Sequence, residues 1–339
     1  MSVTIALAGN PNCGKTTMFN ALTGANQYVG NWPGVTVEKK EGKLKNQKDV
    51  TVTDLPGIYS LSPYTLEEVV SRDYLLKEKP DVIIDLVDAT NIERNLYLAT
   101  QLLEIGIPVV IALNMVDLLK KNNIHINVKG LSSALGCPIV ETSALKGTGL
   151  KEVVDEAIKC ANQHRVPSKQ MEFPKAVEKA VNEIEGFVPA NIAEENKRWY
   201  AVKLLERDSK VKEGLNLPAS AQSRIEEIAS GLEKAEDDDT ESIVTDGRYQ
   251  YIQKVVSANV KRSGNKMTVS DKIDRIVTNR VLGLPIFILT MFIVYYVSVT
   301  TVGTMVTDWT NDSFVGTIQS VVSDGLGNAG VADWLVSLV

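Results

Sequence analysis

The sequence predicts an α/β domain with a mostly parallel sheet, then a small all-α domain and a transmembrane helix. Short apolar runs alternate with helical stretches over residues 1–165, whereas only helical spacing persists over residues 166–270. The stretch between Arg280 and Asp308 then carries no charge. Strands that alternate with helices favour βαβ units, and the ligand loops of such a sheet lie at the carboxyl ends of its strands.

The elements of the first domain follow from these apolar runs. Buried strands are predicted at Val3–Ala8, Val50–Thr53, Val82–Val87, Val109–Asn114 and Ile139–Glu141. Helices are predicted at Lys15–Leu22, Leu66–Lys77, Asn91–Glu104, Lys129–Leu135 and Leu150–Gln163.

The second domain shows apolar residues at helical spacing and no strand signal. Helices are predicted at Ala176–Ile184, Trp199–Leu205, Ile225–Leu232 and Tyr249–Val260. The acidic run from Glu236 to Asp239 is typical of a solvated loop.

A phosphate-binding loop lies between the first strand and the first helix. Residues 9–16 read Gly9-Asn10-Pro11-Asn12-Cys13-Gly14-Lys15-Thr16, a complete G-x-x-x-x-G-K-[ST] motif, and Thr17 continues into the helix. Backbone N–H groups of such a loop converge on the β- and γ-phosphates, Lys15 adds a positive charge, and Thr16 offers its hydroxyl to Mg²⁺. The chain is therefore expected to bind a nucleoside triphosphate.

Two further loops predict that the base is guanine. Asn114-Met115-Val116-Asp117 follows a predicted strand, although Met115 replaces the lysine of the usual N-K-x-D pattern. The carboxylate of Asp117 can accept hydrogen bonds from guanine N1–H and the exocyclic amine, a donor pair that adenine lacks. Ser143-Ala144-Leu145 follows the next strand, where a backbone N–H is expected to reach the guanine carbonyl.

Two more segments are expected to contact the γ-phosphate and the metal ion bound to it. In Asp54-Leu55-Pro56-Gly57, we expect Asp54 to hold Mg²⁺ through water and the Gly57 N–H to contact the γ-phosphate. In Gly34-Val35-Thr36, we expect Thr36 to complete the Mg²⁺ shell once its loop orders.

The composition excludes several other classes of protein. Over 339 residues the net charge is −6, which argues against a nucleic-acid partner. Cys13, Cys137 and Cys160 lack C-x-x-C spacing and are expected to be reduced thiols in a cytosolic setting. His125 and His164 have no partners at metal-ligand spacing and are expected at the surface. We expect no N-terminal signal peptide, because the phosphate-loop strand begins at once.

A membrane helix is predicted over Val281–Thr307, since roughly 20 apolar residues suffice to cross a bilayer. Residues 271–280 form a basic linker before it, and residues 308–339 form a tail whose apolar pieces, Phe314–Val322 and Val331–Val339, either lie on the far interface or re-enter the membrane.

The charges around this helix predict its orientation. Lys or Arg precede the helix at positions 261, 262, 266, 272, 275 and 280, and none follows it. The positive-inside rule therefore places residues 1–280 in the cytoplasm. A chain that ends in an apolar run also suggests the front part of a longer protein.

Four sequence motifs together resemble those of one protein family. Two of them are the phosphate loop and the N-M-V-D segment. The other two are V-G-N-W-P-G-V-T-V-E, from Val29 to Glu38, and D-L-P-G-I-Y-S, from Asp54 to Ser60. The chain resembles the ferrous-iron transporter B family, FeoB, although Cys13 stands where a serine is common in that family. The resemblance implies a cytoplasmic GTPase, a helical spacer with a proposed role in inhibiting nucleotide dissociation, and a polytopic Fe²⁺ permease in the cell membrane (inner or plasma membrane) of a prokaryote. It also implies as partners membrane lipid, the remaining permease segments, small cytoplasmic Feo-type accessory proteins and a homo-oligomer.

The hydrolytic machinery is expected to differ from that of Ras-like enzymes. Ile58 occupies the position of their water-orienting glutamine, and no partner arginine is evident near the switch loops. Resemblance to potassium-activated GTPases implies that Asn12 binds K⁺ and that carbonyls of residues 31–33 complete the cage. The alternative for Asn12 is a loop residue that tolerates an unusual backbone conformation. Trp32 either covers the nucleotide or packs on the surface of its loop.

The predicted function is GTP binding and slow, potassium-stimulated hydrolysis, which reorders residues 25–36 and 57–68 and regulates or drives iron uptake. Lys15, Thr36, Gly57 and Asn12 are the predicted catalytic residues. The alternatives are a membrane-anchored regulatory GTPase without a transport role and an assembly module whose hydrolysis only times partner binding.

Overall fold

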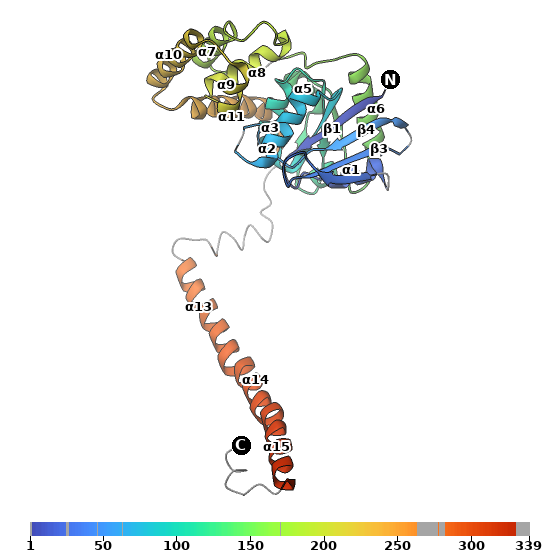
Figure 1. Cartoon of the computed structure of the whole chain (residues 1–339), viewed down its shortest axis with the longest axis vertical. Coiled ribbons are helices and arrows are strands. Elements are labelled where there is room, and N and C mark those ends of the chain that lie inside the picture. The colour runs from blue at the N-terminus through green and yellow to red at the C-terminus, as the bar shows by residue number, and fades with distance from the viewer. Residues whose placement is uncertain are drawn as a thin grey trace. The chain divides into compact units, whose positions relative to one another are not determined.

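The computed structural model describes residues 2–24, 27–45, 47–62, 64–169, 171–262, 277 and 282–329. The chain divides into two compact units, Met1–Gly264 and Asn265–Val339 (Figure 1). The basic residues Lys266, Lys272, Arg275 and Arg280, and the predicted apolar piece Val331–Val339, lie outside the described residues.

The first unit contains a seven-stranded sheet with the strand order β2-β3-β4-β1-β5-β6-β8. Its strands are β1 (Val3–Gly9), β2 (Gln27–Asn31), β3 (Glu38–Leu44), β4 (Gln47–Asp54), β5 (Val82–Asp88), β6 (Val109–Asn114) and β8 (Ile139–Glu141). The strands β4, β1, β5, β6 and β8 run parallel, as the alternating pattern predicted. All the predicted strands are confirmed.

The antiparallel strands β2 and β3 were missed. Their residues are mostly polar or half-exposed, so they carry no apolar run. They form because β3 pairs with β4 and β2 pairs with β3 at the edge of the sheet.

Helices cover both faces of the sheet. The helices α1 (Lys15–Thr23) and α6 (Leu150–Asn162) bury Met18, Phe19 and Val153 in one hydrophobic cluster with β1, β5 and β6. The helices α2 (Leu66–Asp73), α3 (Ile92–Leu103) and α5 (Val128–Leu135) contribute to the other cluster. A π-helical segment, Tyr74–Glu78, extends α2, and α4 (Val116–Leu119) is a single short turn.

The helical part comprises α7 (Lys175–Glu185), α8 (Glu194–Leu205), α9 (Ser209–Leu215), α10 (Ala219–Glu236) and α11 (Thr240–Asn259). The predicted helices are confirmed, and α9 is an addition too short for a periodic signal. Residues 237–239 form the expected exposed loop between α10 and α11.

One prediction for this part is wrong, because it does contain a strand. The strand β9 (Val260–Arg262) pairs antiparallel with β7 (Ile124–Ile126). Three residues are too few for a strand pattern, and the pairing partner lies far away in the sequence. This strand pairing holds the end of α11 against the domain that contains the seven-stranded sheet.

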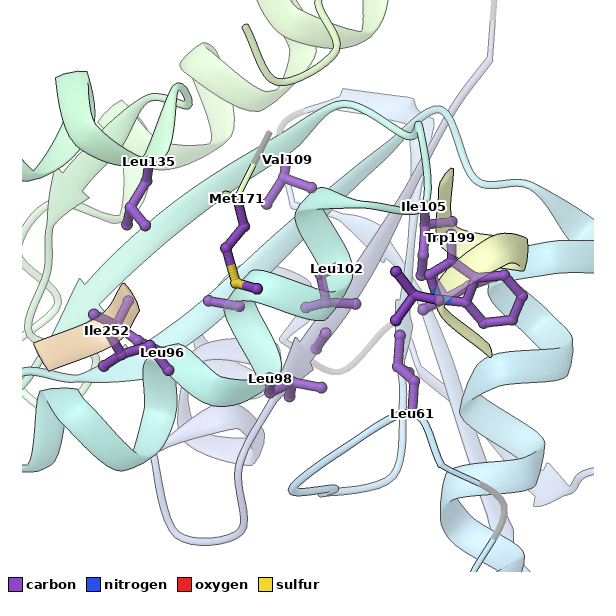
Figure 2. Packing of buried hydrophobic residues seen from close by; sticks show 14 of the residues in the cluster. Leu61, Leu96, Leu98, Leu102, Ile105, Val109, Leu135, Met171, Trp199 and Ile252 are labelled. Atoms are coloured by element: carbon purple, nitrogen blue, oxygen red, sulfur yellow. The ribbon is translucent and has the colours of Figure 1, made fainter. Parts of the chain in front are cut away.

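A shared hydrophobic core joins the helical part to the sheet-bearing domain. Leu102 and Ile105, at the end of α3, lie in the same buried cluster as Met171, Trp199 and Ile252 (Figure 2). Two buried ion pairs also link the parts: Arg248 to Glu104 at 2.6 Å, and Arg72 to Asp208 at 2.7 Å. The helical part therefore depends on α3 and α2 for part of its core.

The second unit is helical from Gly283 to Asn328, over α13 (Gly283–Tyr295), α14 (Thr304–Asp308), α15 (Gly316–Asn328) and the π-helical segments Tyr296–Gly303 and Trp309–Val315. Among the described residues, one helix, Gly283–Leu326, is long and apolar enough to cross a membrane, and an 18-residue window within it has a mean hydropathy of 2.0. Its apolar side chains are exposed within the chain, as those of a lipid-facing helix would be. The helix continues past Thr307, where the predicted span ended.

Candidate nucleotide-binding site

Two glycines fix the phosphate loop between β1 and α1. Gly9 and Gly14 have φ angles of 148° and 96°, which side-chain-bearing residues rarely adopt. A Cβ atom at Gly14 would lie 2.4 Å from Asn114 Nδ2, and one at Gly9 would lie 2.8 Å from the carbonyl oxygen of Leu86. The loop therefore packs directly on the neighbouring strands, and only glycine fits at these positions.

The predicted loops meet around one cleft of about 700 Å³ at the carboxyl edge of the sheet, within the usual size range of ligand pockets. Of the predicted nucleotide-binding residues, Asn10, Pro11, Asn12, Gly14, Lys15, Thr16, Thr17, Gly57, Asn114, Met115, Asp117, Ser143, Ala144 and Leu145 line it. Leu118 also lines the cleft, and the sequence analysis missed it.

The remaining predicted residues lie outside this lining. Gly9, Asp54, Leu55 and Pro56 belong to the loops but are not among the residues that line the cleft. The Cys13 side chain is buried in the core, and burial, with the nearby charge of Asp85, raises the pKa of its thiol to about 12. Its contribution to a ligand would therefore come from the backbone.

The Gly34-Val35-Thr36 segment also lies outside the cleft lining. It forms a turn in which the Val35 N–H donates to the Trp32 carbonyl at 3.2 Å, and the Thr36 side chain is exposed. The role of Thr36 as a metal ligand stays a prediction.

Lys15 and Asp54 form a buried ion pair beside the cleft. The Lys15 Nζ donates to Asp54 Oδ1 at 2.6 Å, and both side chains are less than a tenth exposed. Burial raises the pKa of Asp54 more than the positive charge of Lys15 lowers it. The phosphate-loop lysine is thus held by the aspartate of the D-x-x-G loop, which ties the two loops together.

Asn114 joins three loops of the site. Its Nδ2 donates to the Cys13 carbonyl at 2.8 Å, and its Oδ1 accepts from the Ala144 N–H at 2.9 Å. The Thr142 hydroxyl donates to the same oxygen at 3.3 Å. Asn114 therefore holds the phosphate loop and the serine–alanine turn in register, a role that its motif did not reveal.

Asp117 is held as a carboxylate at the other end of the cleft. A hydrogen bond from the Ser143 side chain, together with Lys146 at 3.3 Å, lowers the pKa of Asp117 despite some burial. An ionised carboxylate accepts hydrogen bonds without donating any, as recognition of guanine N1–H and the exocyclic amine requires. Lys146 is a residue of the site that the sequence analysis missed.

The structure places the three side chains that were predicted to bear on hydrolysis or on covering the nucleotide, which are Asn12, Ile58 and Trp32. Asn12 lines the cleft and has a left-handed backbone (φ 67°), which agrees with the conformational alternative and does not conflict with an ion-binding role. Ile58 is buried, so it cannot orient water. Trp32 is buried with its ring edge on Tyr74, the centroids 5.3 Å apart, and is not among the cleft residues.

The side chains at the phosphate-loop end of the cleft suit a Mg²⁺ ion that is bound partly by the phosphates of a nucleotide. They do not suit a metal ion that is bound by protein side chains alone. Among the residues that the structure describes, no group of three or more His, Cys, Asp or Glu side chains could hold a metal ion. The exposed Thr16 hydroxyl and the buried Asp54 carboxylate lie at the phosphate-loop end, where they would hold Mg²⁺ together with phosphate and water oxygens.

A parallel α/β domain whose phosphate loop, D-x-x-G loop and N-x-x-D loop surround one cleft is a P-loop GTPase. Residues 3–157 match the ferrous iron transport protein B family (FeoB_N), and residues 173–261 match the FeoB cytosolic helical domain. The chain belongs to the FeoB family.

Similarity to individual proteins supports the same family. The chain is 38% identical to an Fe(2+) transport protein A/Fe(2+) transporter FeoB fusion protein of Porphyromonas gingivalis, over 98% of this chain and 41% of that protein. It is 39% identical to the Fe(2+) transporter FeoB of Escherichia coli K12, over 88% of this chain and 38% of that protein. The crystal structure of NFeoB from S. thermophilus bound to GDP·AlF₄⁻ and K⁺ is 48% identical, with a TM-score of 0.69 over 75% of this chain and 99% of that one. The chain spans about two fifths of the length of the curated relatives.

Proposed function

We propose that this chain is the cytoplasmic GTP-hydrolysing module of a membrane Fe²⁺ uptake transporter, in which GTP turnover regulates or drives iron entry. The observation that carries the proposal is the meeting of the three nucleotide loops on one cleft, with the Asp117 carboxylate at one end and Lys15 at the other. The names of the relatives supply Fe²⁺ as the cargo of the complete protein. They favour this reading over a regulatory GTPase without transport and over an assembly module.

The proposed cofactors are GTP or GDP, Mg²⁺ and K⁺. Thr16, Asp54 through water and, in an ordered switch loop, Thr36 would hold Mg²⁺, and Asn12 would hold K⁺. These ions supply positive charge that offsets the charge developing on the phosphate oxygens. The phosphate loop orients the triphosphate, and the Gly57 backbone, which packs against Pro11, lies at the γ-phosphate end.

The proposed location is the cell membrane (inner or plasma membrane) of a prokaryote, with residues 1–280 in the cytoplasm. The apolar helix and the Lys and Arg residues that precede it support this orientation. The proposed partners are membrane lipid, the remaining permease segments, a small Feo-type accessory protein and further copies of the chain. The fusion protein of Porphyromonas gingivalis supports the accessory partner.

Potassium should stimulate hydrolysis through Asn12. GTP turnover should be faster in KCl than in NaCl at constant ionic strength, because the smaller Na⁺ should fit the same cage poorly. An arginine finger is worth about 10³–10⁵ in rate, and an ion with a less fixed geometry should give less. Asn12→Ala should remove the difference while leaving GTP affinity largely intact. Equal wild-type rates in the two salts would reject the potassium model and leave Asn12 with a conformational role.

Iron uptake should depend on the phosphate loop. In liposomes that contain the complete transporter, Lys15→Ala should lower both GTP hydrolysis and GTP-dependent Fe²⁺ entry, because it removes the charge that faces the triphosphate. Lys159→Ala, an exposed lysine on α6, provides the matched control. If Lys15→Ala abolishes hydrolysis while Fe²⁺ entry continues at the wild-type rate, the regulatory GTPase becomes the better assignment.

A further inference from the structure

An arginine that the sequence analysis did not place lies beside the second switch loop. The guanidinium of Arg94, in the first turn of α3, stacks over the ring of Tyr59, with its Cζ atom 4.4 Å from the ring centroid. Tyr59 is the second residue after Gly57. Arg94 is therefore an arginine beside the second switch loop that was not evident from the sequence.

Arg94 differs from the other arginines that the structure describes. Each of the others pairs with a carboxylate, as Arg72, Arg198 and Arg248 do in the core and Arg165, Arg207, Arg224 and Arg262 do nearer the surface. Arg94 has no ion pair among the described residues, and the neighbouring Glu93 pairs with Arg262 instead. Among the described residues, the face of the Tyr59 ring is the contact that the exposed Arg94 guanidinium makes.

The same helical turn also contacts the phosphate loop. Asn10, which is buried and lines the cleft, donates from Nδ2 to the Arg94 carbonyl at 3.4 Å. Its Oδ1 is buried without a hydrogen-bond partner within the described chain. The backbone of Arg94 thus holds the phosphate loop while its side chain holds the switch loop.

The switch loop in turn lies directly on the phosphate loop. The Ile58 N–H donates to the Gly9 carbonyl at 3.3 Å, and a Cβ atom at Gly57 would lie 3.2 Å from Pro11 Cα. Residues 57–59 are therefore held between the phosphate loop and Arg94. A displacement of Tyr59 would move the Gly57 N–H relative to the γ-phosphate end of the cleft.

We propose that Arg94 is a positioning residue for GTP hydrolysis, which acts by holding Tyr59 and thereby the Gly57 N–H against the phosphate loop. This inference rests on the GTPase function proposed above. It predicts that loss of the stack slows the chemical step and leaves nucleotide affinity unchanged, since the residues that bind the base and the phosphates stay in place.

The test measures single-turnover GTP hydrolysis of the full chain in detergent, alongside the affinity for a non-hydrolysable GTP analogue. Arg94→Met and Tyr59→Leu should each slow hydrolysis about twofold to fivefold, the size expected for one exposed cation–π contact. The double variant should be no slower than either single variant. Arg94→Lys and Tyr59→Phe, which keep a cation and an aromatic ring, should restore most of the rate. Arg224→Met, an exposed arginine on α10, is the matched control.

Four outcomes would overturn the proposal. Wild-type rates in Arg94→Met would show that the stack has no role in hydrolysis. Additive losses in the double variant, or a far larger loss in Arg94→Met than in Tyr59→Leu, would show that Arg94 acts on the phosphates and not through the ring. Equal losses of rate and affinity would indicate a merely structural role. Absence of GTP hydrolysis in the wild type is a distinct result, because it would reject the proposed function itself.

Discussion

Asp117→Asn should abolish the selectivity of this chain for guanine nucleotides and raise its affinity for xanthine nucleotides. The wild type should prefer GTP to ATP by roughly 10⁴-fold, because binding adenine would leave the Asp117 carboxylate without its hydrogen-bond donors. Asparagine replaces an acceptor-only carboxylate by an amide that also donates, which matches the second carbonyl of xanthine. Competition of GTP, ATP and XTP against a fluorescent nucleotide measures the change.

Its control is Asp155→Asn, which makes the same change at an exposed position on α6 and should leave all three affinities unaltered. Lys146 and Ser143 contact Asp117. The loss of the carboxylate therefore removes an ion pair as well as the base contact, and XTP binding separates the two effects. Equal wild-type affinities for GTP and ATP would contradict the guanine assignment.

Breaking the buried ion pair between Arg248 and Glu104 should have the largest effect on stability. The guanidinium donates twice to the carboxylate, at 2.6 and 3.1 Å, and both side chains are about 1% exposed. Arg248→Met leaves the Glu104 charge buried without its partner, so the free energy of unfolding should fall by about 3–5 kcal/mol. Urea unfolding followed by tryptophan fluorescence measures the loss, because Trp199 lies in the same core.

A double variant separates the buried charge from lost packing. Adding Glu104→Met to Arg248→Met removes both charges and should recover much of the stability, since apolar replacement of a buried pair is often near neutral. Arg224→Met breaks an exposed pair with Glu227 and should change the free energy of unfolding little, because solvent screens exposed pairs. If Arg248→Met costs no more than Arg224→Met, the pair does not stabilise the junction between the helices and the sheet-bearing domain.

The sequence alone determined the elements that contain a local signal. The parallel strands β1, β5 and β6 are continuous apolar runs because both of their faces are buried, and such runs are visible without a structure. The phosphate loop was equally predictable, because its chemistry requires glycines and a lysine at fixed spacing. Because the ligand loops of a parallel sheet lie at the carboxyl ends of its strands, the loops at Asn114 and Ser143 were expected beside the phosphate loop, and most of the cleft lining was predicted.

Only the tertiary structure decided the features that depend on distant partners. The strands β2, β3, β7 and β9 are short or polar and form because they pair with other strands, so no periodic sequence pattern predicts them. Arg248 and Glu104 look like ordinary surface residues in the sequence, yet the shared core of α3 and α11 buries both. Asn114, Lys146 and Arg94 likewise acquire their contacts from loops that are far apart along the chain. Their roles depend on distances in space, which residue type and local spacing do not encode.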